Sequence, residues 1–164
     1  MKNITMIAAV GKNLELGKNN DLIWHFKEDM KFFKENTMGK PIVMGMNTLN
    51  SLPKLLPGRT HIVLTTKNNI SLDEQIVVVH TIDELLNYIE KYGKEVMIIG
   101  GASVYKQMLE YSDKLILTEI DAEEKDADVY FPEFNKENWN SEVVGTHEEN
   151  GTKFKHLVYT RKDY

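Results

Sequence analysis

Residues Ile4–Val10 read ITMIAAV, a run that is apolar except for Thr5. Short runs rich in β-branched residues are typical of strands that a sheet buries on both faces. The run stops at Gly11-Lys12, with no helical continuation and no clear cleavage site, so it resembles neither a signal sequence nor a membrane span. We therefore expect a buried first strand in a protein of the cytoplasm.

Further apolar runs along the chain predict more strands, at Ile42–Met44, Ile62–Leu64, Ile76–Val79, Val96–Ile99 and Leu115–Ile120. Helical patterns alternate with them, at Phe26–Asn36, Asn47–Leu52, Thr81–Tyr92 and Ser103–Tyr111. The third begins with a capping box, Thr81-Ile82-Asp83-Glu84, in which Thr81 can cap the helix and Glu84 can reach back. Near the end, Glu142–Thr146 and Phe154–Arg161 flank Asn150-Gly151, a strong hairpin signal. This order predicts an α/β fold with a central, mostly parallel sheet of about eight strands, a C-terminal antiparallel hairpin and about four flanking helices.

Composition limits the classes of function. The 164 residues fit one domain over 1–164, since no repeat, linker or low-complexity tract interrupts them. A net charge of -5 argues against nucleic acid as the main partner. The absence of cysteine excludes disulfides, thiolate metal sites and a cysteine nucleophile. The histidines show no metal-binding spacing, and we expect most of them at the surface or in strands.

The helix predicted over Phe26–Asn36 carries a single charge on its apolar side. At about 100° per residue, one arc is shared by Phe26, Met30, Phe32 and Phe33. Asp29 projects into this arc. Because a buried carboxylate without a partner is costly, Asp29 either lies at a wet edge of the helix or lines an apolar pocket. In a pocket it would bind a cationic or amidine-like group and could supply a proton.

Two junctions lead from a strand through glycine into a helix, at Met44–Thr48 and Ile98–Ser103. Glycine lets the backbone approach a ligand closely, and free amides at a helix start attract phosphate. Both junctions lack the G-x-G-x-x-G pattern, so each could equally be a tight turn. A pair of such turns at one sheet edge suits an extended ligand such as a dinucleotide.

Other polar segments allow two interpretations each. Thr65-Thr66-Lys67 follows a predicted strand and is either a further phosphate site or a solvated loop. Arg59 could bind a carboxylate or lie on the surface. Trp24 suits core or lid packing. The long polar connection Gly11–Leu22 has the length and glycines of a lid.

Taken in order along the chain, several of these segments resemble those of bacterial dihydrofolate reductase, and the resemblance covers nearly the whole chain. The matching segments are Ile7–Ala9, Leu22–Trp24, Asp29 with Phe33, Thr37, Lys40–Gly45, Leu56–Arg59, Ile99–Gly101 with Val104 and Tyr105, Leu117–Thr118 with Ile120–Ala122, and Phe131–Pro132. Each motif is modest alone, but the ordered set is highly specific.

The resemblance implies reduction of 7,8-dihydrofolate to 5,6,7,8-tetrahydrofolate with NADPH as the cofactor. Hydride would pass to C6, and Asp29 would bond the pteridine ring and assist protonation of N5. It implies a monomer without a metal, a membrane or a nucleic acid as partner. The implied catalytic group is Asp29, Trp24, Leu22 and Thr118, in which Trp24 holds a water and Thr118 bonds the carboxylate.

The same resemblance implies two sets of binding residues. Dihydrofolate would contact Ile7, Ala8, Asp29, Met30, Phe33, Leu52, Leu56, Arg59, Ile99 and Thr118, with Arg59 on the α-carboxylate of the glutamate tail. NADPH would contact Ala9, Leu16, Gly17, Asn20, Gly45, Met46, Asn47, Thr48, Leu64, Thr65, Thr66, Lys67, Ile99, Gly100, Gly101, Ala102, Ser103, Val104 and Tyr105.

The chain departs from the family pattern at four positions, one of which is Leu49, where some relatives have a larger aromatic residue. Ile23 stands where a proline usually precedes the tryptophan. Met46 and Ser103 each replace an arginine that is common in bacterial relatives. A preference for NADPH would then depend on Thr66 and Lys67.

Two other functions remain open at this point. One is the related reductase of riboflavin biosynthesis, which shares the NADPH groove but reduces a ribosylamino-pyrimidine; the pair Trp24 and Asp29 argues against it. The other is a dinucleotide-binding module without catalysis.

Overall fold

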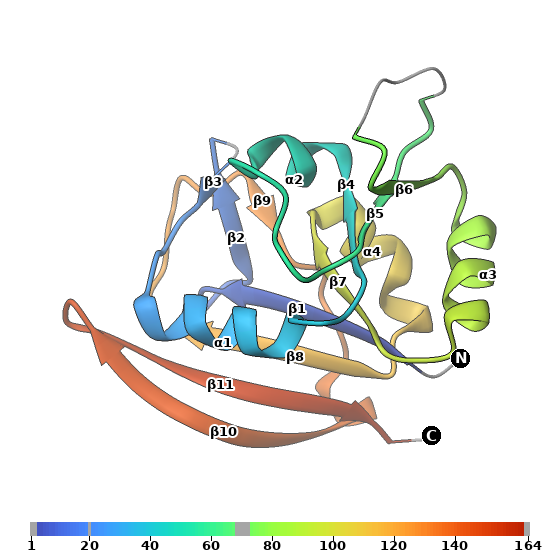
Figure 1. The fold of residues 1–164 in the computed structure, drawn as a ribbon. Coiled ribbons are helices and arrows are strands. Elements are labelled where there is room, and N and C mark those ends of the chain that lie inside the picture. The colour runs from blue at the N-terminus through green and yellow to red at the C-terminus, as the bar shows by residue number, and fades with distance from the viewer. Residues whose placement is uncertain (1–2, 20, 68–72, 163–164) are drawn as a thin grey trace.

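The computed structural model describes residues 3–19, 21–67 and 73–162, and its main feature is a sheet of eight strands in the order β10-β11-β8-β1-β7-β4-β5-β6 (Figure 1). The strands are β1 Ile4–Val10, β4 Ile42–Gly45, β5 His61–Leu64, β6 Ile76–Val79, β7 Val96–Gly100, β8 Lys114–Ile120, β10 Trp139–Glu149 and β11 Thr152–Arg161. Each predicted strand is present, which confirms the expected fold class.

The sheet is parallel from β8 across to β6 and antiparallel at its other end. Strand β1 pairs with both β7 and β8 in parallel, whereas β11 is antiparallel to β8, and β10 to β11. The turn of this hairpin places Asn150 at φ 53° and Gly151 at φ 79°. Positive φ at both positions is the geometry that Asn-Gly favours in a tight hairpin.

Helices cover both faces of the sheet. They are α1 Lys27–Thr37, α2 Met46–Ser51, α3 Ile82–Tyr92 and α4 Ala102–Met108, with short 3-10 turns at Leu109–Tyr111 and Lys136–Asn138. Phe33 of α1 and Leu49 of α2 join one core cluster, while Leu85 of α3 and Met108 of α4 join another. The sheet therefore separates an α1–α2 side from an α3–α4 side. No helix in the described part of the chain is long and apolar enough to cross a membrane.

The predicted capping box of α3 forms with one difference. The Glu84 backbone N–H donates to Thr81 Oγ1 at 3.1 Å, as expected. The Glu84 carboxylate, however, accepts from the backbone N–H of His80 at 2.8 Å rather than from that of Thr81. Both bonds satisfy N–H groups at the start of the helix, which is the physical role of such a box.

The long polar connection Gly11–Leu22 is more ordered than a loop. It contains β2 Glu15–Lys18 and β3 Asp21–Leu22, which form a small sheet with β9 Val129–Tyr130. Glu15 is 1% exposed and accepts from the backbone N–H of Asn13 and of Glu124, both at 2.7 Å. This buried carboxylate joins two segments distant in sequence, which periodicity along one strand does not reveal.

Candidate functional site

Asp29 lies in the first turns of α1 with its side chain turned toward the sheet. The side chain is 21% exposed. Its Oδ1 accepts from Thr118 Oγ1 of β8 at 2.5 Å and lies 3.2 Å from His156 Nε2 of β11. Asp29 therefore does not sit at an open, wet edge of its helix, because two side chains from neighbouring strands hold it.

The apolar groups beside Asp29 form one cluster on the α1–α2 side. Ile7 is 5% exposed and buried in this cluster. Partly buried side chains that pack against it include Phe33, Leu52, Leu56 and Ile99. The structure thus places a carboxylate next to a largely apolar wall, where a flat, partly polar ligand could bond to the acid and pack against carbon.

The two glycine junctions meet beside this wall. A Cβ atom at Gly100, where φ is +136°, would lie 3.2 Å from Thr48 Oγ1, and one at Gly45 would lie 3.3 Å from Val104 Cγ2. Gly45 and Gly101 are the N-cap residues of α2 and α4. Two helix starts therefore lie next to each other, with close backbone approach that only glycine permits at the positive φ of Gly100.

Arg59 is anchored by its own turn and by the end of α1. Its Nε donates to Pro57 O at 3.0 Å, and its Nη1 donates to Thr37 Oγ1 at 3.2 Å. Thr37 in turn donates to Phe33 O at 2.8 Å. This chain of bonds ties the guanidinium to the helix that carries Asp29.

Comparisons with known proteins agree with this geometry. The family model described as dihydrofolate reductase matches residues 3–161. The dihydrofolate reductase of Haemophilus influenzae is 35% identical over 161 residues, which cover 96% of this chain and 98% of that protein. That of Bacillus subtilis is 35% identical over 163 residues, covering 98% and 95%.

A solved structure gives the same result. The dihydrofolate reductase from Enterococcus faecalis, complexed with NADP(H) and RAB-propyl, has a TM-score of 0.85 and 33% sequence identity, covering 98% of this chain and 96% of that one. The chain belongs to the dihydrofolate reductase family. The fold and the order of motifs that indicated this family in the sequence are thereby confirmed.

Within this dihydrofolate reductase fold, several predicted residues are not members of the apolar cluster beside Asp29. Leu22 is 56% exposed and Met30 is 63% exposed. Ala8 packs against the cluster on the α3–α4 side, because side chains alternate along β1 and its neighbour Ile7 faces α1. Ala9 packs with Trp24 in a third cluster near the start of α1.

The predicted phosphate-binding residues after β5 form a turn of their own. Thr65 is buried, and its Oγ1 accepts from the backbone N–H of Lys67 at 3.2 Å. Thr66 and Lys67 are exposed. Leu16 and Gly17 lie on β2 in the small sheet, while Asn20 lies outside the described residues.

The remaining predicted cofactor residues lie at the starts of α2 and α4. Met46 is half-buried and Asn47 is exposed in the first turn of α2. Ala102 is half-buried and Ser103 exposed in that of α4, where Tyr105 is buried and donates to Ile7 O at 2.7 Å. Leu64 is the last residue of β5 and is half-buried.

Sequence reasoning missed His156. It is 3% exposed, on β11, and contacts Asp29. Alternation along β11 puts it on the same face as Phe154, which was the available signal. This face meets α1 because of the order of the strands in the sheet. The pattern of residues along one strand does not reveal that order.

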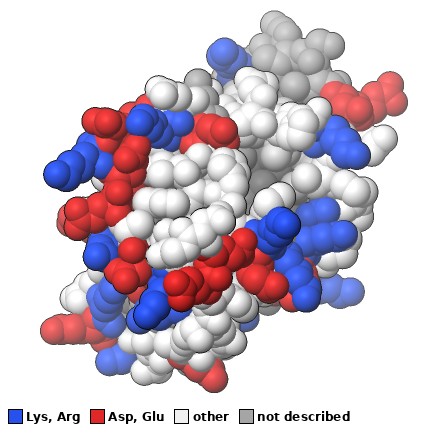
Figure 2. Space-filling view, turned by 90° about the vertical axis from the view of Figure 1, so that its left-hand side faces the viewer, with Lys and Arg blue, Asp and Glu red and all other residues white. Residues whose placement is uncertain are grey.

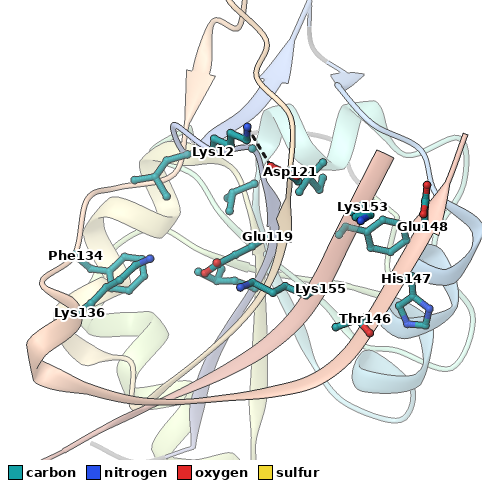
Figure 3. A pocket seen from close by; sticks show the side chains of 16 residues that line it. Lys12, Glu119, Asp121, Phe134, Lys136, Thr146, His147, Glu148, Lys153 and Lys155 are labelled. Atoms are coloured by element: carbon teal, nitrogen blue, oxygen red, sulfur yellow. Dashed lines mark ion pairs between the residues drawn. The ribbon is translucent and has the colours of Figure 1, made fainter. Parts of the chain in front are cut away.

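A separate hollow of about 750 Å³ lies on the other side of the hairpin (Figure 3). Among its lining residues are Leu117, Glu119, Phe134, Lys136 and Lys155. Leu117 belongs to the α3–α4 cluster, whereas its neighbour Thr118 holds Asp29 on the opposite face. The hollow is therefore not part of the dihydrofolate reductase site.

Charge on the side of the molecule that carries β2 and β3 is mixed. Figure 2 shows lysine and arginine side chains interleaved with carboxylates around an uncharged area. Lys12 pairs with Asp121 at 3.1 Å, and Lys18 with Glu124 at 2.8 Å. These two lysines are thus matched by neighbouring acids. Within the described residues no group of three His, Cys, Asp or Glu side chains could hold a metal ion.

Proposed function

We propose that the protein reduces 7,8-dihydrofolate to 5,6,7,8-tetrahydrofolate with NADPH. The observation that carries the proposal is Asp29, a partly buried carboxylate held by Thr118 beside an apolar wall. Membership of the dihydrofolate reductase family supports it.

Asp29 would bind the edge of the pteridine ring that carries the 2-amino group and N3–H. A carboxylate accepts hydrogen bonds only, so it matches the paired N–H groups of an amidine-like edge. The ring would pack against apolar side chains that include Ile7, Phe33 and Ile99. Arg59, which is tied to the far end of α1, would bind the α-carboxylate of the glutamate tail.

The glycine junctions fit a dinucleotide. Gly45 and Gly101 begin neighbouring helices, and a side chain at Gly100 would fill the space against Thr48. The backbone there can approach a pyrophosphate, and free N–H groups at helix starts favour anions. NADPH, when bound, supplies the hydride that C6 of the substrate accepts.

The chain's own residues would orient the substrate ring and raise the proton affinity of its N5. Asp29 would hold the ring and favour protonation at N5. The apolar wall would exclude water from the hydride path. Trp24, which is half-buried against the cluster of Phe26 and Phe154, would hold an ordered water near the ring.

Discrimination between NADPH and NADH would depend on the few cationic side chains that can bind the 2′-phosphate. Met46 and Ser103 stand at the starts of α2 and α4, so no arginine is available there for the 2′-phosphate. Lys67, exposed after β5, is the cation that we propose for this role. The ratio of kcat/KM values for NADPH and NADH, in the parent and in Lys67→Ala, tests it: the ratio should fall in the variant, and an unchanged ratio would remove Lys67 from the proposal.

We also propose that residues 1–164 act as one domain, as a monomer and in the cytoplasm. Sedimentation velocity at micromolar concentration should give the mass of one chain of 18.9 kDa. A dimer mass would contradict the monomer.

Asp29→Asn tests the central claim. The variant should fold like the parent, lose about 10²-fold or more of its turnover at neutral pH, and recover part of it at acid pH, where the substrate arrives already protonated. Dihydrofolate-dependent oxidation of NADPH, followed spectroscopically across pH, measures both effects. Glu28→Gln, one residue away on the exposed side of α1, is the matched control and should keep parental turnover.

Two results would contradict the proposal. Parental turnover in Asp29→Asn would remove the proton role. Binding of NADPH by the parent without any dihydrofolate-dependent oxidation would indicate a dinucleotide-binding module, and turnover of a ribosylamino-pyrimidine instead would indicate the riboflavin-type reductase.

A further inference from the structure

The Asp29 carboxylate is held by two donors at the same oxygen. Thr118 Oγ1 and His156 Nε2 lie 2.5 Å and 3.2 Å from Oδ1. A carboxylate has no hydrogen to give, so the contact assigns the proton of His156 to Nε2. Within the described part of the chain, no protein donor is recorded at Oδ2. The arrangement therefore leaves that oxygen for a ligand.

The imidazole of His156 is fixed by the same helix that carries Asp29. Its ring stacks on Phe32 with centroids 3.7 Å apart and planes 3° from parallel. The Phe154 ring, also on β11, packs against the His156 ring with centroids 5.9 Å apart. Asp29 and Phe32 are three residues apart, so they share one face of α1. Two residues of α1 therefore hold the same imidazole ring: Phe32 stacks on it, and Asp29 accepts its hydrogen bond.

The groups that face His156 come from three elements. From α1 the titratable group is Asp29, and from β8 the residue directly opposite is Thr118. From β10 the residue opposite is Gly145, and the His147 ring lies 5.1 Å from the His156 ring. A Cβ atom at Gly145 would lie 3.4 Å from His147 Nε2 and 3.6 Å from His156 Nδ1, so the glycine leaves room for both rings.

We propose that His156 is a positioning residue for Asp29: its Nε2–H fixes the carboxylate plane so that Oδ2 faces the pteridine. This inference rests on the proposed function. As the neutral Nε2–H tautomer, His156 donates this bond without adding a charge beside the carboxylate.

Two substitutions separate positioning from packing. His156→Phe keeps an aromatic ring to stack on Phe32 and removes the donor. His156→Gln keeps a donor without a titrating group. His147→Phe is the matched control. It removes the neighbouring imidazole, which forms no hydrogen bond with Asp29 in the described part of the chain.

The measurement is kcat/KM for dihydrofolate at pH 7. We expect His156→Phe to lose about 10-fold in kcat/KM, as for the loss of a hydrogen bond to a charged group. His156→Gln, which keeps a donor, should show a smaller fall. The KM for NADPH should not change in either variant, and His147→Phe should keep the parental kcat/KM.

Parental kcat/KM in His156→Phe would overturn the proposal and leave His156 a packing residue, as would equal losses in His156→Phe and His156→Gln. A second readout, independent of turnover, is ¹⁵N NMR of the histidine side chains in the parent protein at pH 8. It should show His156 as the Nε2–H tautomer, and the Nδ1–H tautomer would overturn the proposal. If the parent shows no dihydrofolate-dependent turnover, the proposed function fails while this spectrum still tests the contact.

Discussion

His61 uses both ring nitrogens to hold the segment that carries Arg59. The backbone N–H of Leu56 donates to its Nε2 at 3.0 Å, and its Nδ1 lies 3.2 Å from Arg59 O. The bonds together require a neutral ring with the proton on Nδ1. Burial, and to a lesser extent the Arg59 charge, lowers the pKa of His61 below its ordinary value of 6.5, although the bond to Arg59 O opposes this.

The lowered pKa of His61 predicts a loss of stability in mild acid. The unfolded chain takes up this proton first, so the stabilisation is complete above about pH 6.5 and is lost as the pH falls from there toward the folded pKa. Urea unfolding from pH 8 to 5 should show a steeper fall for the parent than for His61→Gln, which does not titrate. Parallel pH dependences would contradict this.

The helix α1, which carries Asp29, begins without a cap of its own. Its N-cap residue is Phe26, which has no side-chain acceptor. Glu149, at the end of β10, supplies the cap: Oε1 accepts from the backbone N–H of Lys27 and Oε2 from that of Glu28, both at 3.0 Å. These bonds, chiefly that from Glu28, lower the pKa of Glu149. The hairpin thus holds the helix at its first turn as well as at Asp29.

Glu149→Gln should lower the thermal midpoint at pH 7, because an amide cannot accept both N–H groups in this way. Since the folded pKa is lowered, the contribution exists above the ordinary value of 4.5 and is lost as the pH falls through the folded pKa. Scanning calorimetry from pH 7 to 3 should therefore show the two proteins converge. Glu148→Gln, exposed and adjacent, is the control and should melt like the parent at pH 7.

At the scale of the whole molecule, one buried stack joins the C-terminal hairpin to the start of α1. Phe154 on β11 stacks on Phe26 with centroids 4.4 Å apart and planes 6° from parallel, and the two are 3% and 5% exposed. Ile120 of β8 is buried in the same cluster. The last strands of the chain therefore complete the surface on which α1, the helix that carries Asp29, rests.

Phe154→Ala should reduce the free energy of unfolding by about 3–5 kcal/mol, because it removes a buried ring and leaves a cavity. Urea unfolding at pH 7 measures the change. Val144→Ala on the outer strand of the same hairpin, where the side chain is 49% exposed, should change stability by about 0.5 kcal/mol or less. Equal effects of the two substitutions would show that the stack does not join the hairpin to the helix.

The sequence by itself determined the strands of the eight-stranded sheet, the four helices and the family, but not the small sheet of β2, β3 and β9. The run Ile4–Val10 matches its strand end for end, because burial on both faces leaves a continuous apolar run. Ile76–Val79 also matches end for end, although it forms the edge strand and is mostly half-buried. The Asn150-Gly151 turn and the cap at Thr81 were also readable, since turn and cap chemistry is local. Asp29 was detectable as a charge out of place on its own helix.

Only the tertiary structure decided what surrounds Asp29. His156 lies 127 residues away in sequence, and Glu149, which caps the same helix, lies 122 residues from Lys27. Each meets α1 because β11 pairs with β8 in the sheet. Periodicity reports which side of one element is buried, whereas the partner of that side depends on strand order and register, which involve the whole chain at once.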